Sequence, residues 1–329
     1  MSSKYQVLCM GNAIVDVIAR VDDQFSETHE RVKGSMMLVD AETSAKLYDN
    51  MPPAIERSGG SAGNTAAGIA SFGGKVAYIG KVHSDQLGTV FRHDIKAAGV
   101  SYETAPASDG APTATSMILV TPDGQRTMNT FLGACVELTP DDVHEDEAGA
   151  ADVLYVEGYL WDTPSMKASV LKAFDLAHAA GKQVSLSLSD SFCVDRFREE
   201  FTDLVENQVD ILFANEDEIK SLYQVDNFDE AVAMLRPHVK VAALTRSEKG
   251  SVVITADEEV SVDAFPTSVE DTTGAGDLFA AGFLYGYTNG YSLEKSAKLG
   301  SLAAAEVISH LGARPETSLA SLAQDKIKP

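Results

Sequence analysis

From residue 151 onward, short apolar runs alternate with longer segments of helical periodicity, and this alternation leaves the chain few possible folds. The strands it predicts are Val153–Val156, Gln183–Leu188, Ile211–Ala214 and Val241–Thr245. The helices it predicts are Ser165–Ala179, Phe197–Glu206, Glu216–Tyr223, Ala275–Tyr287 and Leu293–Ser309, with a hairpin at Ser251–Ala264. Strands that alternate with helices form parallel sheets covered on both faces. We therefore predict a three-layer α/β/α fold with a mainly parallel central sheet.

The N-terminal part predicts more of the same sheet. Tyr5–Met10 has the composition of a buried strand, and helices at Gly63–Phe72 and Leu87–Ala98 enclose a strand at Val76–Ile79. No Pro/Gly/Ser-rich linker, low-complexity tract or internal repeat interrupts the chain. We expect one α/β domain over residues 1–329.

Two segments predict a small β-sheet beside this main body. Ile14–Val21 alternates apolar and polar residues, as a strand with one exposed face does. Thr113–Val120 and Arg126–Phe131 form a hairpin around the turn Pro122-Asp123-Gly124. We expect these pieces, approximately residues 12–40 and 107–132, to project from the main body as a lid.

The net charge narrows the class of ligand. The chain has 26 basic and 49 acidic residues, a formal net charge of −23. Such a surface repels nucleic acid and anionic membranes, so we expect neither as a partner. A nucleotide remains acceptable, because a few local donors and a divalent metal can reverse the field inside one cleft.

The cysteines and the N-terminus favour the cytoplasm. Cys9, Cys135 and Cys193 are widely spaced, with no CxxC pair and no zinc-like group with histidine. Met1–Arg20 lacks the continuous apolar core of a signal peptide. No run reaches the roughly 18 apolar residues of a membrane helix. We therefore expect a reduced, cytoplasmic protein.

The stretch most informative about chemistry is 270–283, where small residues precede an apolar helix. Gly274-Ala275-Gly276 leaves the backbone N–H groups of the first helical turn open to an oxyanion. Asp277 lies in the same turn, placed to accept the proton of an attacking hydroxyl as a general base. Phosphoryl transfer needs this combination of anion binding and alignment.

Other functions are possible for this stretch, and the sequence distinguishes among them. A bare Gly-x-Gly more often serves helix capping and close packing, whereas the full run with its two acids and two threonines favours an anion site. The chain contains no P-loop motif and no protein-kinase catalytic loop. The dinucleotide motif GxGxxG fails because Phe279 stands at the position of its last glycine.

Two motifs resemble those of the ribokinase-like carbohydrate and nucleoside kinases, the PfkB family. The run Asp271–Asp277 is similar to the C-terminal signature of that family, in which the last Asp is the catalytic base. Gly59–Ala66 is similar to the N-terminal signature, which holds substrate hydroxyls. The resemblance covers nearly the whole chain. It implies the ribokinase-like fold and a kinase that uses ATP and Mg²⁺, with a monovalent cation such as K⁺ as a further candidate cofactor.

The resemblance also implies individual roles. The residues expected to hold the acceptor are Asn12, Asp16, Gly60, Ser61 and Asn64. The residues expected to contact the nucleotide are Asn215, Thr245, Ser247, Gly250 and Thr272. Ser247 departs from the Thr-x-Gly-x-x-Gly loop usual at this place, where the family has a glycine. Glu218 with Asn215 matches an Asn-x-x-Glu pattern associated with magnesium, which we expect to bind through water.

Several details favour a nucleoside over a sugar as acceptor. Met37 is a soft apolar residue on the expected lid, and Phe192 lies in a stretch that resembles the corresponding one in the family's adenosine kinases. Both residue types can cover a purine, although both more often fill cores. Arg126, on the lid hairpin, is either a residue that closes over the transferring phosphoryl group or a solvent-facing strand residue.

The resulting hypothesis is phosphorylation of the 5′-hydroxyl of a ribonucleoside, adenosine above all, to give AMP. A sugar kinase of the ribokinase or fructokinase type is the enzymatic alternative. A small-molecule binding protein that keeps the fold without turnover is the alternative of another class. Because a lid sheet can pair between subunits in relatives, both a monomer and a homodimer remain open.

Overall fold

The computed structural model describes residues 3–327, and their central sheet confirms the predicted fold class. The strands of this sheet are β1 (Tyr5–Met10), β5 (Val76–Ile79), β6 (Ser101–Tyr102), β9 (Ala151–Glu157), β10 (Gln183–Ser187), β11 (Ile211–Asn215), β12 (Val241–Thr245), β13 (Ser251–Ile254) and β14 (Glu259–Val262). Within the described residues the sheet order is β14-β13-β12-β11-β10-β9-β1-β5-β6. Every pair from β12 to β6 is parallel, and only β13 and β14 are antiparallel.

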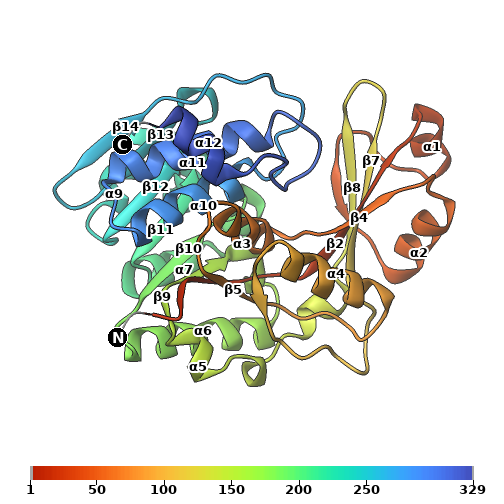
Figure 1. The fold of residues 1–329 in the computed structure, drawn as a ribbon, viewed down its shortest axis with the longest axis horizontal. Helices are drawn as coiled ribbons and strands as arrows, with labels where there is room; N and C mark the ends of the chain where they lie inside the picture. The colour runs from red at the N-terminus through yellow and green to blue at the C-terminus, as the bar shows by residue number, and fades with distance from the viewer. Residues whose placement is uncertain (1–2, 328–329) are drawn as a thin grey trace.

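Helices cover both faces of this sheet (Figure 1). One face carries α3 (Ser61–Ser71), α4 (Gln86–Ala97), α10 (Ala275–Thr288), α11 (Leu293–Val307) and α12 (Leu319–Lys326). The other carries α5 (Glu145–Ala148), α6 (Pro164–Ala179), α7 (Ser191–Asn207), α8 (Glu216–Tyr223) and α9 (Phe228–Leu235). Side chains of a strand alternate between faces, so Val7 and Cys9 enter the first core while Leu8 and Met10 enter the second. This double burial explains why β1 is a continuous apolar run.

A second, small sheet projects from the main body, as predicted (Figure 1). Its strands are β2 (Ile14–Arg20), β3 (Met36–Leu38), β4 (Ile55–Ser58), β7 (Ala114–Val120) and β8 (Arg126–Phe131), in the order β3-β8-β7-β2-β4. We call this sheet the lid. The β7–β8 hairpin lies where the sequence predicts it, whereas β4 falls outside the two segments expected to form the lid.

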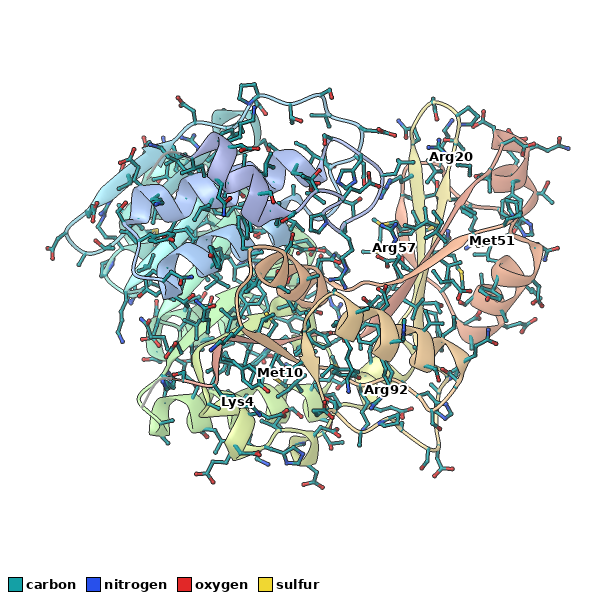
Figure 2. All side chains as sticks on the ribbon, viewed as in Figure 1. Lys4, Met10, Arg20, Met51, Arg57 and Arg92 are labelled. Carbon is teal, nitrogen blue, oxygen red and sulfur yellow. The ribbon has the colours of Figure 1, made fainter. Side chains whose placement is uncertain are left out.

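The outer side of the lid carries two helices, α1 (Asp23–Thr28) and α2 (Ala41–Asn50). They enclose a small core of Ala19, Val21 and Leu119, against which Phe25 and Met51 pack. Figure 2 labels Met51 in this region and Met10 inside the main body. Phe25 and Met51 also pack against the core on one face of the central sheet, so the lid is joined to the main body through apolar contacts.

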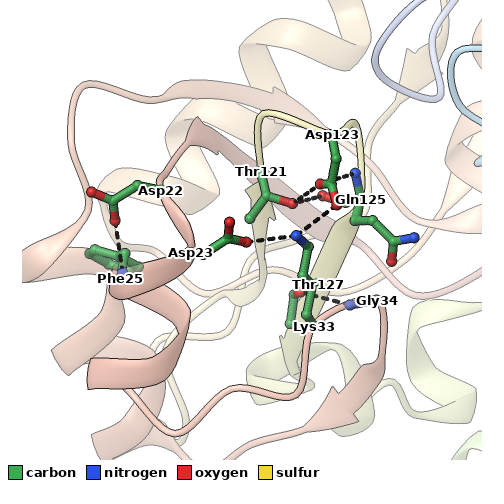
Figure 3. Close-up of polar contacts among 9 residues, drawn as sticks. All are labelled: Asp22, Asp23, Phe25, Lys33, Gly34, Thr121, Asp123, Gln125 and Thr127. Atoms are coloured by element: carbon green, nitrogen blue, oxygen red, sulfur yellow. Dashed lines mark hydrogen bonds and ion pairs between the residues drawn. The ribbon is translucent and has the colours of Figure 1, made fainter.

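Polar contacts hold the tip of the lid hairpin to the segment between α1 and β3 (Figure 3). The Lys33 ammonium lies 2.6 Å from Asp23 Oδ1 and 2.7 Å from Asp123 Oδ2. The Gly34 N–H donates to Thr127 Oγ1 at 3.1 Å. These contacts tie the turn of the hairpin to the connection between α1 and β3.

Several helices depart from the predictions. The sequence analysis did not predict α2, α9 and α12, which have 10, 8 and 8 residues and show the short apolar pattern that is hardest to detect. It also placed the start of α7 at Phe197, which was wrong, because the helix begins at Ser191. The signal was present, since Asp190 caps α7 by accepting from the Cys193 N–H at 2.6 Å. Phe197 itself is non-helical, with φ −125° and ψ 25°, and marks a kink.

Among the residues the structure describes, none of the helices combines the length and the apolar character that crossing a bilayer requires.

The conformation of the loop after β12 requires a glycine at position 250. Gly250 has φ +82°, and a Cβ there would lie 2.0 Å from the Val262 carbonyl oxygen. Gly124 has a similar φ of +80°, but a Cβ there meets nothing within 4 Å. We expect Gly124→Ala to destabilise the fold by about 1 kcal/mol, the cost of a left-handed conformation. Gly250→Ala should cost at least about 2 kcal/mol more, because backbone must also move.

Urea denaturation of the two variants and the wild type measures the difference. Equal losses of unfolding free energy in both variants would contradict the clash at Gly250.

Candidate active site

The candidate site lies at the carboxyl edge of the central sheet, beside β1 and β9. From β1 the chain adds β5 and β6 on one side, and from β9 it adds β10, β11 and β12 on the other. The strand order therefore reverses between β1 and β9. In open parallel sheets, ligands bind outside the carboxyl ends of the strands at such a point. Asn12 follows β1 and Glu157 ends β9, so both lie there.

The two sequence motifs, more than 200 positions apart, meet at this edge. Asp277, in the first turn of α10, accepts from Ser61 Oγ at 2.6 Å through Oδ1. Its Oδ2 accepts from Asn64 Nδ2 at 2.9 Å. Thr65 Oγ1 donates to the Asp277 carbonyl at 3.1 Å. The start of α3 is thus fixed on the start of α10.

Asp277 is half-buried, and its environment acts on its charge in two directions. Burial raises the pKa of the Asp277 carboxyl, while the hydrogen bonds from Ser61 and Asn64 and the charge of Arg314 lower it. Each carboxylate oxygen accepts one hydrogen bond and keeps a lone pair for another donor. A hydroxyl of a bound molecule could be that donor, so the group can serve as a general base.

The backbone just before Asp277 forms a possible anion site. Gly274 caps α10 in the left-handed region, with φ +79°. Within residues 3–327, no acceptor lies opposite the backbone N–H of Gly276 or Asp277, and Ala275 donates only to Thr272 O at 3.3 Å. A Cβ at Gly276 would meet nothing within 4 Å, so the approach is open. Free N–H groups at a helix N-terminus attract an oxyanion.

Asn12 is held by a residue that the sequence analysis missed. Glu157 is 1% exposed; its Oε1 accepts from the Asn12 N–H at 2.9 Å and its Oε2 from the Ala62 N–H at 2.7 Å. Burial raises the pKa of Glu157 to about 7, although these two hydrogen bonds lower it. An acid directly after an apolar strand was the available sequence signal. Glu157 thereby ties β1, β9 and α3 together.

Gly60, Asn12 and Asn64 surround the same space. Gly60 has φ +82°, and a Cβ there would lie 2.1 Å from Asn12 O, so only glycine fits this turn. Two buried oxygens, Asn12 Oδ1 and Asn64 Oδ1, have no hydrogen-bond donor among the described residues. Because buried polar atoms are normally paired, such oxygens indicate a place for ligand hydroxyls or water.

Asp16 reaches this region from β2 of the lid. A Cβ at Gly59 would lie 2.3 Å from Asp16 Oδ2, so the Asp16 carboxylate packs directly against the Gly59 backbone. Burial raises the pKa of Asp16 to about 7, Arg314 and Arg126 lower it, and Asp277 raises it further. The structure therefore brings two carboxylates and two guanidinium groups close to one another.

Arg126 is bound to the loop that precedes α10. Its Nη2 lies 2.7 Å from Asp271 Oδ2, and the two side chains are 8% and 3% exposed. Its Nη1 donates to Thr273 Oγ1 at 3.2 Å. The interpretation of Arg126 as a solvent-facing strand residue was wrong, because burial and the pair with Asp271 hold it inward. That it also contacts a phosphoryl group stays a prediction.

Met37 and Phe192 lie on two different parts of the chain. Met37 is half-buried on β3, opposite Asn129 of β8. Phe192, the second residue of α7, is 66% exposed, and its ring centroid lies 5.4 Å from the guanidinium carbon of Arg196. Their contact with a nucleobase stays a prediction.

Asn215 and Glu218 form a capping box at the start of α8. Asn215 Oδ1 accepts from the Glu218 N–H at 2.9 Å, and Glu218 accepts from the Asn215 N–H at 2.9 Å and from Nδ2 at 2.5 Å. Burial raises the pKa of Glu218 to about 7. Both carboxylate oxygens are therefore engaged, which fits a metal held through water better than one held directly. The described residues contain no group of three or more His, Cys, Asp or Glu side chains placed to hold a metal ion.

The remaining candidates for nucleotide contact lie at the end of β12, in the loop after it, and in the loop before α10. Thr245 ends β12, opposite Ser251 of β13. Ser247 has φ +51°, a left-handed conformation that explains why a glycine would suit this position. Gly250 closes the loop, and Thr272 is exposed just before α10. Their contacts with a nucleotide stay predictions.

Arg314, between α11 and α12, is a second residue that the sequence analysis missed. It donates to Ser58 O from Nε at 2.9 Å and from Nη2 at 2.7 Å, and to Gly63 O from Nη1 at 2.5 Å. No local pattern marks this arginine, so sequence alone carried no signal for it.

The chain is similar to kinases across almost its whole length. The family model described as "pfkB family carbohydrate kinase" matches residues 48–319. Adenosine kinase of Saccharomyces cerevisiae is 29% identical over 330 residues, covering 93% of this chain and 95% of that protein.

Two solved structures agree with the observed fold. A probable sugar kinase protein from Rhizobium etli is 54% identical with a TM-score of 0.91, covering 98% of each chain. The adenosine kinase from Sinorhizobium meliloti is also 54% identical with a TM-score of 0.91, covering 98% of this chain and 99% of that one. The matched family model and these relatives show that the chain belongs to the pfkB family of carbohydrate kinases and is a kinase acting on an alcohol group.

Proposed function

We propose that this kinase transfers the γ-phosphoryl group of ATP to the 5′-hydroxyl of a ribonucleoside, adenosine to AMP, with Asp277 as general base. One observation carries the proposal: Asp277 is fixed by Ser61 and Asn64 beside helix N–H groups that have no protein acceptor. A base and an anion site then lie within one helical turn. Phosphoryl transfer is catalysed mainly by such alignment and charge stabilisation.

The reaction assigns a task to each group. The acceptor hydroxyl oxygen bonds to the γ-phosphorus, the bond from that phosphorus to the β–γ bridging oxygen breaks, and ADP leaves. The hydroxyl proton passes to the Asp277 carboxylate, late in the transfer. The N–H groups of Gly276 and Asp277, which follow the cap at Gly274, hold the transferring oxyanion. Asn12, Asp16 and Asn64 orient the acceptor through its other hydroxyls.

The described residues fit a phosphate group, because the N–H groups that open α10 have no protein acceptor. They fit Mg²⁺ through water, with Glu218 and Asn215 as the outer partners, since Mg²⁺ keeps several waters and is held largely by substrate phosphates. The metal would neutralise phosphate charge. A monovalent cation such as K⁺ stays a further candidate.

Two relatives support the choice of a nucleoside: the kinases from Saccharomyces cerevisiae and Sinorhizobium meliloti are both named adenosine kinases. The exposed ring of Phe192 and the half-buried Met37 can cover a purine. The alternative is a sugar acceptor, because the Rhizobium etli protein of equal identity and TM-score is named a probable sugar kinase.

The cytoplasm is the compartment we propose, because Cys9, Cys135 and Cys193 are all buried and free, as in a reduced protein. We leave monomer and homodimer as equal possibilities for its assembly.

Replacing the base tests the mechanism. Asp277→Asn should lower kcat roughly 10²-fold or more, because the amide cannot take the proton, while acceptor affinity changes little. Coupled ADP release measures kcat, and calorimetry measures affinity. Asp175→Asn, which changes an exposed carboxylate on α6, is the matched control and should behave like the wild type. If Asp277→Asn keeps kcat within a few-fold, Asp277 is not the base.

An acceptor panel tests the substrate class. We expect kcat/KM for adenosine to exceed that for ribose or fructose by about 10- to 100-fold, since stacking of a base contributes roughly 1–3 kcal/mol. Initial rates with adenosine, inosine, ribose and fructose measure this ratio. The same rates in potassium and in sodium buffer show whether the reaction depends on K⁺. A preference for fructose or ribose would establish the sugar kinase instead, and nucleoside binding without turnover would establish a binding protein.

A further inference from the structure

Arg314 makes several hydrogen bonds near the site, and the proposed reaction assigns it no task. Its guanidinium donates to Ser58 O, to Ser58 Oγ at 3.0 Å, and to Gly63 O at 2.5 Å. The side chain comes from the segment between α11 and α12, more than 240 residues away in sequence. It therefore binds the lid sheet and α3 from a third part of the chain.

The two carbonyls that Arg314 binds lie on either side of the Gly59-Gly60 turn. Ser58 ends β4 of the lid, and Gly63 lies in the first turn of α3. Paired glycines give a backbone wide conformational freedom, so this turn needs external support to hold one shape. Ser61 and Asn64, which bind Asp277, lie within or next to the braced segment.

The segment that carries Arg314 also contacts the other side of the site. The Gly312 N–H donates to Asp271 Oδ2 at 3.1 Å. A Cβ at Gly274 would lie 2.8 Å from Ala313 Cβ, so Ala313 packs on the cap of α10. Three successive residues thus contact the loop before Asp277 and, through Arg314, the turn before Ser61. A displacement of Arg314 would shift one motif relative to the other.

Charge adds to this geometry. Burial lowers the pKa of Arg314, and the acidic groups that raise it are Asp94 on α4, Asp16 on β2, Tyr78 on β5 and Asp277 on α10. Arg314 is the cation that lowers the pKa of the Asp277 carboxyl, and together with Arg126 it lowers that of Asp16.

Three further ionisable groups that interact with Asp277 come from β9 and the turn after it. They are Tyr155, Glu157 and Tyr159, and Asp277 raises the pKa of each. None of these three groups carries a positive charge, so none of them can replace Arg314.

We propose that Arg314 is a positioning residue for phosphoryl transfer, which braces the Ser58–Asn64 segment against the start of α10, where Asp277 lies. The inference rests on the proposed function, in which Asp277 must be unprotonated to act. Positive charge nearby favours the ionised carboxylate, and its removal favours the protonated one. The acidic limb of the rate profile should therefore move to higher pH when Arg314 loses its charge.

The test compares two substitutions through the pH dependence of kcat/KM. Arg314→Gln should lower kcat/KM at neutral pH by about 10²-fold and move the acidic limb upward by about one pH unit. Arg314→Lys keeps the charge but cannot reproduce the fork of donors, so it should lower kcat about 10-fold with the limb unmoved. In Arg314→Ala, added guanidinium chloride should restore part of the activity at concentrations that leave the wild type unchanged.

Arg236→Gln is the matched control. The Arg236 guanidinium also donates to backbone carbonyls, those of Thr255 at 2.8 Å and Glu258 at 3.2 Å. These lie in the turn between β13 and β14, at the opposite edge of the sheet from Asp277. Its rate profile should match that of the wild type. A thermal unfolding scan of each variant shows which losses come from unfolding, and a lower assay temperature keeps a weakened variant folded.

Two results would overturn the inference: an Arg314→Gln rate within threefold of the wild type, or a loss of activity that is equal at every pH. A titration of the Asp277 carboxyl by carbon NMR, identified with Asp277→Asn, gives a readout independent of turnover. An equal pKa of Asp277 in wild type and Arg314→Gln would refute the charge role even if no acceptor were phosphorylated. Failure of the wild type on every acceptor would refute the proposed function alone.

Discussion

The candidate site depends on the contact between the N-termini of α3 and α10, where Ser61 and Asn64 donate to the two oxygens of Asp277. Both helices point their first turns at the same space, so free N–H groups, hydroxyl-binding side chains and a carboxylate converge there. Gly68 makes the approach possible, because a Cβ at that position would lie 2.6 Å from Ala281 Cβ on α10. Small residues in α3 therefore serve the geometry of the site as much as the core.

The site concentrates carboxyl groups in a place that disfavours their charge. Burial raises the pKa values of Asp16 and Glu157 to about 7, and it also raises that of Asp277. A carboxyl group whose pKa is raised on folding stabilises the fold while it is protonated. That stabilisation is lost as the pH rises from the ordinary pKa of the group toward 7, so at neutral pH such groups lower the free energy of unfolding. Two half-buried arginines, Arg126 and Arg314, lower the pKa of Asp16 and so oppose the effect of burial. A chain of net charge −23 thus keeps local positive charge where a polyphosphate would have to bind.

The lid is linked to the chemistry through Arg126. Its pair with Asp271 joins β8 of the lid to the loop that opens α10, and the contacts of Lys33 stiffen the far end of the same hairpin (Figure 3). Movement of the lid would therefore displace the loop before α10 and change the position of the free N–H groups. Lids that close over a phosphoryl donor exclude water and suppress hydrolysis. The proposed reaction needs such exclusion, because water competes with the acceptor hydroxyl.

The sequence by itself determined the features that depend on neighbours in the chain. The strand Tyr5–Met10, the hairpin at Arg126, the alternation after residue 151 and the helix that opens at Ala275 all follow from local periodicity, turns and capping, and the structure has them. It also marked Asp277 and Asn64 through their motifs. Local patterns were insufficient where elements are short, as in α9, or where a kink interrupts one, as at Phe197.

Only the tertiary structure decided which of these pieces meet. The hydrogen bonds of Asp277 with Ser61 and Asn64, the support of Asn12 by Glu157 and the brace from Arg314 all join positions more than 140 residues apart. The inward pair of Arg126 with Asp271 belongs to the same group. The physical reason is that backbone hydrogen bonds and side-chain periodicity act within a few residues. Contacts between distant segments instead depend on how the helices and the two sheets pack, and no local pattern encodes that packing.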